Sequence, residues 1–292
     1  MVDMKATCFI GVVLSALLQA QSAPSSAVPK WDVVSVKRCT PGTERGGDSS
    51  PGRLSIGCGC LAGSDNTGLI QVAYNRYARG YFTSARVIPI EGVPDWVHSE
   101  SFDIEARAEG RPNFTMMEGP MMQAILEDRF KLKIHRETRQ GPVYELALGK
   151  GSPRLKPMQP GKCTPAPIGR PSAPLPDGQR YCRGIVNPRG AVDIEGGTLV
   201  GFAALLGMAL DRPVIDKTGL TDSFEIHLRF SPDDATSPRP DTAGPDTSAA
   251  VTAPDAPSVF QAIQEQLGLR LVPAKGPVDV LVIDHIERPS GN

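Results

Sequence analysis

The side chains best suited to metal or acid–base chemistry in this chain are its four histidines, His98, His135, His227 and His285. A protein-bound metal takes Cys, His or carboxylate ligands that lie at short spacings within one or two segments. The histidines lie far apart, and three fall in expected strands without a Cys, an Asp or a second His at such a spacing. His227 and His285 could meet across a sheet, but the pattern favours surface histidines, and we expect no metal ligand.

No complete catalytic or cofactor motif accompanies these histidines. The segment Asp216-Lys217-Thr218-Gly219 has residues found in phosphotransfer and β-lactamase motifs, but the Ser-x-x-Lys nucleophile motif is missing. The sequence also lacks Gly-x-Ser-x-Gly, the phosphate-binding Gly-x-x-x-x-Gly-Lys-Ser/Thr and the zinc-binding His-Glu-x-x-His. We therefore interpret Thr218-Gly219 as turn residues, and we expect no catalytic residue and no cofactor.

The first 22 residues have the pattern of a secretory signal peptide. Lys5 precedes an apolar run from Ala6 to Leu18, and small residues suited to cleavage follow, Ser22 among them. The run is too short to cross roughly 30 Å of hydrocarbon as a helix, so an uncleaved anchor is the less favoured alternative. We expect cleavage after Ser22 and a secreted or periplasmic protein without a membrane span.

The cysteines that remain after the signal peptide are disulfide candidates, because an exported chain folds in an oxidising compartment. Cys163 and Cys182 bracket a proline-rich loop with few residues to bury, and we expect them to pair. Cys39 ends one strand-like run and Cys58 or Cys60 ends the next, so a second bridge from Cys39 to one of these is expected. A redox or metal dithiol at Cys58-Gly59-Cys60 is less favoured, because a zinc site needs four ligands.

A basic segment between positions 129 and 139 is the clearest candidate for an interaction surface. On a strand, Lys131, Lys133 and His135 share one face, and Leu132 and Ile134 share the other. The simplest interpretation is a solvated face. The functional hypothesis is an electrostatic docking strip for an anionic glycan or a partner protein.

The elements that must position these residues recur along the chain. Two sets of segments match in the same order: Ser101-Phe102-Asp103-Ile104, Gln123-Ala124-Ile125, Leu132-Lys133-Ile134 and Gly141-Pro142-Val143 in the first, and Ser223-Phe224-Glu225-Ile226, Gln261-Ala262-Ile263, Leu269-Arg270-Leu271 and Gly276-Pro277-Val278 in the second. The repeated part predicts an amphipathic helix, a strand, a Gly-Pro turn and a second strand. We therefore expect internally duplicated βαββ-type modules.

Periodicity predicts strands over 31–37, 102–106 and 278–286 and helices over 116–129 and 258–267. Ser258 is the expected N-cap of the last helix, and Gly268 is its expected stop. Together these elements predict an α+β fold with mixed or antiparallel sheets and helices packed on one face. Periodicity leaves open whether the two halves share one sheet.

Composition divides the 292 residues into the signal peptide (1–22), a first α+β half (23–158), a proline-rich insert (159–190) and a second half (191–292). Residues 231–257 contain almost no large apolar side chain, so we expect a disordered linker there. The 31 basic and 32 acidic residues nearly cancel, which gives no reason to expect nucleic acid or an anionic membrane as a partner. The oligomeric state is left open.

Segments spread over most of the chain resemble a soil-associated, mainly acidobacterial family of proteins of unknown function, the DUF3738 group. The resemblance rests on Trp31–Lys37, Val93–Trp96, Ser101–Ala106, Leu126–Arg139, Arg212–Thr221 and Val280–His285. It implies an exported protein that is sometimes fused behind a BlaR1-like membrane metallopeptidase, and it carries over no catalytic residue. The chain departs from the family pattern in an expanded 74–89 stretch and in a less polar helix at 207–210.

Export, duplication and disulfide candidates together favour a non-catalytic binding or interaction module that recognises a protein or glycan. An extracytoplasmic hydrolase with a site assembled from scattered residues is the first alternative. A sensor domain linked to a membrane peptidase is the second, and it rests on the family resemblance alone.

Overall fold

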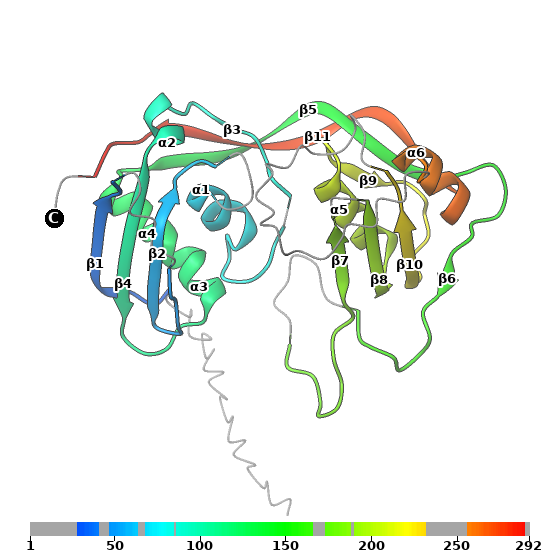
Figure 1. Cartoon of the computed structure of the whole chain (residues 1–292), viewed down its shortest axis with the longest axis horizontal. Coiled ribbons are helices and arrows are strands. Elements are labelled where there is room, and N and C mark those ends of the chain that lie inside the picture. The colour runs from blue at the N-terminus through cyan, green and yellow to red at the C-terminus, as the bar shows by residue number, and fades with distance from the viewer. Residues whose placement is uncertain are drawn as a thin grey trace, which may run out of the picture.

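The computed structural model of the chain describes residues 28–40, 47–63, 68–84, 86–165, 173–187, 190–231 and 256–289. The predicted signal peptide at 1–22 and nearly all of the predicted linker at 231–257 lie outside the described residues. Two hydrophobic cores lie side by side beneath one long two-stranded ribbon, which runs along the top of Figure 1. We call the two bodies around these cores the first and the second lobe.

The first lobe is built on a three-stranded antiparallel sheet with the order β1-β4-β2. Its elements are β1 (Trp31–Arg38), β2 (Arg53–Cys60), α1 (Leu69–Gln71), η1 (Val72–Arg76), α2 (Asp95–Ser99), β4 (Ser101–Ala108), α3 (Phe114–Glu118) and α4 (Pro120–Arg129). Alternate residues of β4 face opposite sides, so Phe102 and Ile104 enter the core while Glu105 is exposed. The helices cover the apolar face of this sheet (Figure 1).

The second lobe has a four-stranded sheet with the order β6-β10-β8-β7. Its elements are β6 (Lys156–Pro157), β7 (Gly184–Asn187), β8 (Ala191–Gly197), α5 (Leu199–Ala209), β10 (Phe224–Arg229), α6 (Val259–Ala262) and η2 (Ile263–Leu267). Val192 and Ile194 of β8 alternate into the core, where they meet Phe202 and Leu206 of α5. The second lobe therefore also has its helices on one face of its sheet.

The ribbon joins the lobes because each of its two strands contributes to both cores. β5 (Lys133–Leu148) and β11 (Leu269–His285) pair antiparallel from Leu269 opposite Leu148 to His285 opposite Lys133. β11 starts at Leu269 in the second core and carries Leu281 and Ile283 into the first. The two short strands β3 (Ile90–Glu91) and β9 (Val214–Asp216) flank the ribbon in the order β3-β11-β5-β9. The two halves of the chain thus share one sheet.

The α+β fold with mixed and antiparallel sheets is confirmed. The order strand, helix, short flanking strand, strand, helix and long strand occurs twice, from β2 to β5 and from β8 to β11. Among the described residues, no helix combines the length and the apolar character needed to cross a membrane. Duplication of the sequence itself stays a prediction.

One feature of the predicted modules is wrong. Gly141-Pro142 and Gly276-Pro277 were expected to form turns between two strands, but both lie inside the continuous strands β5 and β11. Over this stretch β5 and β11 pair only with each other, because β9 reaches positions 144–146 of β5 and β3 reaches positions 281–282 of β11. Each proline therefore lies in a strand with one open edge, where a missing N–H is tolerated.

The helix expected over 116–129 is interrupted at Gly119. A side chain at this position would collide with the carbonyl oxygen of Tyr77, and Pro120 then begins α4 at a position that needs no N–H donor. The predicted caps of the last helix are confirmed. Ser258 accepts a hydrogen bond from the N–H of Gln261, and Gly268 adopts a left-handed φ of 66°.

Candidate functional site

A cleft of about 700 Å³ lies between the lobes in the described part of the chain. Most of its lining comes from the second lobe, from α5, from β8 and from the segment around Cys182. The first lobe contributes a wall made of Phe82, Thr83, Ser84 and Arg86. Its volume falls within the range of about 300 to 1,000 Å³ that is usual for small-molecule sites.

Helix α5 forms the floor of the cleft, and it is apolar on every side. Its residues Leu199 to Ala209 include no charged or amide side chain. One stripe, including Phe202 and Leu206, is buried in the second core. The opposite stripe, including Val200 and Ala204, lines the cleft, and Val200 is 58% exposed. A helix that is apolar all round is normally buried on both sides, so this face lacks a cover among the described residues.

Two glycines let β7 and β8 approach α5 and the neighbouring disulfide. A Cβ atom at Gly184 would lie 2.7 Å from Cδ1 of Leu205. A Cβ atom at Gly196 would lie 3.0 Å from the sulfur of Cys182 and would collide with Met158. Any larger residue at either position would have to displace the cleft wall.

The disulfide Cys163–Cys182 closes the proline-rich loop next to the cleft, and Cys182 and Pro165 are among the lining residues. A buried carboxylate, Glu225 of β10, holds the start of this loop. Its two oxygens accept hydrogen bonds from Nζ of Lys156 (2.6 Å) and Nζ of Lys162 (2.9 Å). These two ammonium groups lower the pKa of Glu225 to about 2.

Buried amide side chains hold the first-lobe wall in place. Nδ2 of Asn75 donates to the carbonyl oxygen of Arg86 at 2.6 Å, and Nε2 of Gln71 donates to that of Ile88. Thr115 Oγ1 donates to the carbonyl oxygen of Gly80 at 2.6 Å. Since Gln71 and Asn75 are both buried, they anchor this surface segment to the first lobe.

Apart from the disulfide-bonded Cys182, the described residues that line the cleft include two with ionisable side chains, Arg86 and Arg183. No histidine, carboxylate or free thiol occurs among the described lining residues. A hydrolytic site needs a nucleophile or metal together with a base within hydrogen-bonding reach. The described lining is therefore predominantly apolar, which suits contact with an apolar molecule.

The structure separates the four histidines. His227 lies on β10 with its Nδ1 2.8 Å from Asp193, whereas His285 lies at the first-lobe end of β11 with its Nε2 2.7 Å from Glu287. The expectation that these two could meet across one sheet is wrong, because β10 and β11 belong to different sheets. His98 lies in α2, with its Nδ1 3.1 Å from the carbonyl oxygen of Ala62.

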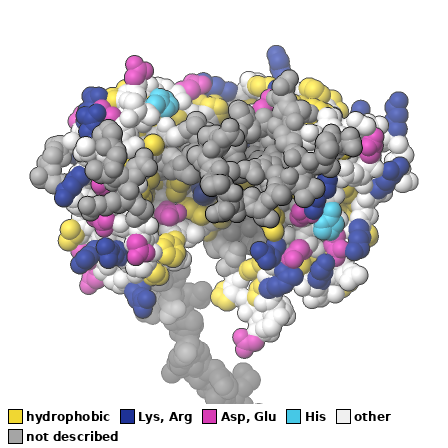
Figure 2. All heavy atoms as spheres, in the orientation of Figure 1, with side chains coloured by type: hydrophobic (Ala, Val, Ile, Leu, Met, Phe, Trp, Pro, Cys, Tyr) yellow, Lys and Arg dark blue, Asp and Glu magenta, His cyan; other side chains and the backbone are white. Residues whose placement is uncertain are grey.

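The predicted docking strip differs in part from its expected geometry. Lys133 and His135 are exposed on β5, but Lys131 precedes the strand in a left-handed conformation with a φ of 51°. Hydrogen bonds to Glu137 and Asp284 raise the pKa of His135. Figure 2 shows Lys and Arg side chains intermixed with Asp and Glu side chains on the visible face of the molecule. The strip stays a prediction, and the carboxylates of Glu137 and Asp284 lie beside its His135.

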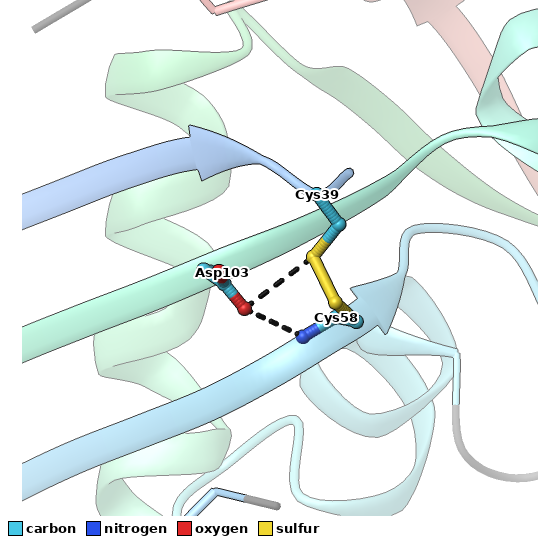
Figure 3. A group of neighbouring side chains, drawn as sticks. All are labelled: Cys39, Cys58 and Asp103. Carbon is cyan, nitrogen blue, oxygen red and sulfur yellow. Dashed lines mark hydrogen bonds between the residues drawn. A yellow bond between two sulfur atoms is a disulfide. The ribbon is translucent and has the colours of Figure 1, made fainter. Parts of the chain in front are cut away.

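The second disulfide is Cys39–Cys58, and Cys60 is a free thiol beside Ser101. Figure 3 shows the bond crossing the face of β4 from β1 to β2. A β-bulge after Ile56 lifts Cys58, whose N–H donates to Oδ1 of Asp103 at 2.9 Å. Cys39, Cys58 and Asp103 have metal-ligating atoms close together, but the disulfide occupies both sulfurs. The two cysteines therefore form a covalent cross-link rather than a metal site.

The Asp216 to Gly219 segment forms the expected turn. Asp216 Oδ1 accepts hydrogen bonds from the N–H (2.9 Å) and the hydroxyl (2.7 Å) of Thr218. Ser64-Asp65-Asn66 matches a second β-lactamase motif that the sequence interpretation overlooked. It lies outside the described residues, and the Ser-x-x-Lys motif needed to supply a nucleophile is still missing.

Sequence reasoning missed the cleft, although two signals pointed to it. Both segments that depart from the family resemblance, 74–89 and 207–210, contribute lining residues, among them Phe82, Arg86 and Met208. The apolar composition of Leu199 to Ala209 was the other signal.

A family model described as "Protein of unknown function (DUF3738)" matches residues 67–286 of the chain. No curated protein matches the sequence. No solved structure matches it either.

Proposed function

The chain belongs to the DUF3738 family, and because that description assigns no activity, we propose from its geometry that the protein is a non-catalytic binding protein. The cleft between its lobes is the binding site, and its ligand is a small molecule with an apolar body. The observation that carries this proposal is the exposed apolar face of α5, which lies in a cleft of about 700 Å³.

The size of the exposed apolar surface supports a ligand. Burial of apolar surface stabilises a complex by roughly 25 cal/mol for each Å² removed from water. A ligand in the cleft would cover Val200 of α5 and Phe82 of the first lobe, which are 58% and 48% exposed. The same ligand would touch both lobes and so stabilise their relative position.

The proposed place of action is the periplasm or the outside of the cell. The signal pattern at 1–22 and the two disulfides support export. A lipid-like or aromatic compound encountered outside the cytoplasm fits the apolar lining better than a glycan does, because a glycan needs many hydrogen-bonding side chains.

Filling the cleft tests the proposal. Ala204 is exposed on α5 and lines the cleft, so in Ala204→Trp an indole ring takes up part of the volume. Ala124 is exposed on α4, outside the cleft, so Ala124→Trp is the matched control. The neutral fluorescent probe N-phenyl-1-naphthylamine would be titrated into the mature protein and both variants.

We expect the natural protein and Ala124→Trp to bind the probe equally, and Ala204→Trp to bind it at least tenfold more weakly. Circular dichroism should show the same fold in all three. Absence of binding to the natural protein, or equal affinities for all three, would overturn the proposal.

A further inference from the structure

We propose that the ligand of the cleft carries an anionic group on its apolar body, in the simplest case a carboxylate, and that Arg86 and Arg183 recognise this group. The inference rests on the proposed function of the cleft and narrows its ligand to one chemical class. It comes from the charges on the two walls, since Arg86 belongs to the first lobe and Arg183 precedes β7 in the second.

The first-lobe wall carries one positive charge that has no direct partner in the described structure. The acid whose negative charge acts on Arg86 is Asp279 of β11, and this charge raises the pKa of Arg86. Both oxygens of Asp279 are already engaged, one by Nη1 of Arg136 at 2.9 Å and the other by Oγ1 of Thr138 at 2.8 Å. Burial lowers the pKa of Arg86, as expected for a partly desolvated guanidinium without an ion pair.

The second-lobe wall repeats this arrangement. Glu195 of β8 is the acid beside Arg183, and its Oε2 accepts a hydrogen bond from Nη1 of Arg180 at 2.5 Å. The same oxygen accepts the backbone N–H of Arg183 at 3.2 Å. The guanidinium of Arg183 itself makes no ion pair with any described residue, so it remains available to a ligand.

Each wall therefore has one acid shared between two arginines, and one cation on each wall faces an apolar cleft. Arg86 is partly buried, so leaving its guanidinium unpaired beside apolar surface has a free-energy cost that a bound anion would offset. Arg183 is exposed, so its guanidinium can reach a ligand without first being released from another residue. Guanidinium groups also bind carboxylates with two parallel hydrogen bonds. An apolar molecule with an anionic end satisfies both the apolar floor and the two arginines, whereas a neutral one leaves the charges unpaired.

A matched pair of ligands separates the charge from the apolar body. Decanoate and decan-1-ol have the same chain length, but decanoate is ionised at neutral pH. Each would displace N-phenyl-1-naphthylamine from the mature protein and from Arg86→Gln, Arg183→Gln and Arg107→Gln. Arg107 is exposed on β4 outside the cleft, so Arg107→Gln controls for the loss of one positive charge.

We expect decanoate to bind about tenfold more tightly than decan-1-ol, and each cleft variant to weaken decanoate about tenfold, the effect of one charge-assisted hydrogen bond. Decan-1-ol should bind all four proteins equally, and Arg107→Gln should bind decanoate like the natural protein. Equal affinity for the two ligands, or equal weakening of both by Arg86→Gln and Arg183→Gln, would overturn the anionic class. In either case, the proposed function would still be supported if the natural protein bound N-phenyl-1-naphthylamine and Ala204→Trp bound it more weakly.

Calorimetry of decanoate with Ala204→Trp completes the test. Loss of decanoate binding in this variant would support the cleft as the anion site. Undiminished binding would place the anion elsewhere on the surface and overturn the inference.

Discussion

Gly141 of β5 and Gly276 of β11 lie directly opposite each other, at the point where the ribbon passes from one lobe to the other. The space that a side chain at Gly141 would occupy is filled by Val278, with Cγ2 2.9 Å from the Cβ position. Cδ1 of Ile215 at 2.9 Å and Cγ2 of Val143 at 3.0 Å fill the corresponding space at Gly276. The two Gly-Pro-Val segments therefore pack into each other reciprocally, which explains why both contain glycine.

This packing predicts that Gly141→Ala lowers the free energy of unfolding by about 1 to 3 kcal/mol, because the new methyl group overpacks against Val278. Removing two methyl groups in Gly141→Ala/Val278→Ala should recover part of that loss. Urea unfolding of the single and double variants would give the coupling energy.

The control for this cycle is Gly141→Ala/Val143→Ala. Val143 fills the space at Gly276, not the space at Gly141, so this pair should show no recovery. If both double variants recovered stability to the same extent, the reciprocal packing would be wrong.

The ion pairs of Glu225 predict a specific loss of stability in acid. The folded-state pKa of about 2 lies below the ordinary value of the carboxyl group, so the stabilisation is present above that ordinary value. It is lost as the pH falls through the folded-state pKa. Glu225→Gln should thus be less stable than the natural protein at pH 7, and the difference should shrink steadily from about pH 5 downward.

Urea unfolding at a series of pH values would measure that difference. Glu109→Gln changes an exposed carboxylate to which no described residue is paired, so it should leave stability nearly unchanged at every pH. A Glu225→Gln difference of constant size between pH 7 and pH 3 would contradict the assignment of Lys156 and Lys162 as its partners.

The disulfides predict unequal roles for the cysteines. Cys163 and Cys182 close a loop with a sequence separation of 19, and a loop of that size contributes roughly 3 kcal/mol in the chain-entropy model. Cys163→Ala/Cys182→Ala should lose up to that amount and should also bind N-phenyl-1-naphthylamine more weakly, because Cys182 lines the cleft. Cys60→Ser, which removes a free thiol, should change stability by less than about 0.5 kcal/mol.

Unfolding without reducing agent, together with non-reducing peptide mapping, would check both statements. A peptide linking Cys39 to Cys60 would show that the free thiol is Cys58, contrary to the structure.

The elements that the sequence predicts well are those decided by local contacts. Ser258 caps its helix through an N–H three residues ahead, and Gly268 supplies the left-handed residue that ends it. Strand β1 follows from the alternation that begins at Trp31. Each of these depends on residues within one or two turns of chain.

The features that the sequence does not reveal depend on residues far apart. Gly-Pro usually marks a turn, and Gly141-Pro142 became part of a strand because Gly276 and Val278 pack against it from more than 130 positions away. The sequence does not predict the cleft, because an apolar helix such as α5 is normally buried on both sides. The sequence does not show that Arg86 and Arg183 lack an ion pair, because this depends on Asp279 and Glu195 being bonded to Arg136 and Arg180 instead.

The course of β11 also bears on when the protein can finish folding. Leu281 and Ile283, which complete the first core, are supplied by the strand that begins in the second core at Leu269. During synthesis the first lobe therefore waits for residues that emerge more than 170 positions after β4 has left the ribosome. The first core therefore cannot close before the C-terminal part of β11 has been made, which couples completion of the first lobe to a late stage of translation.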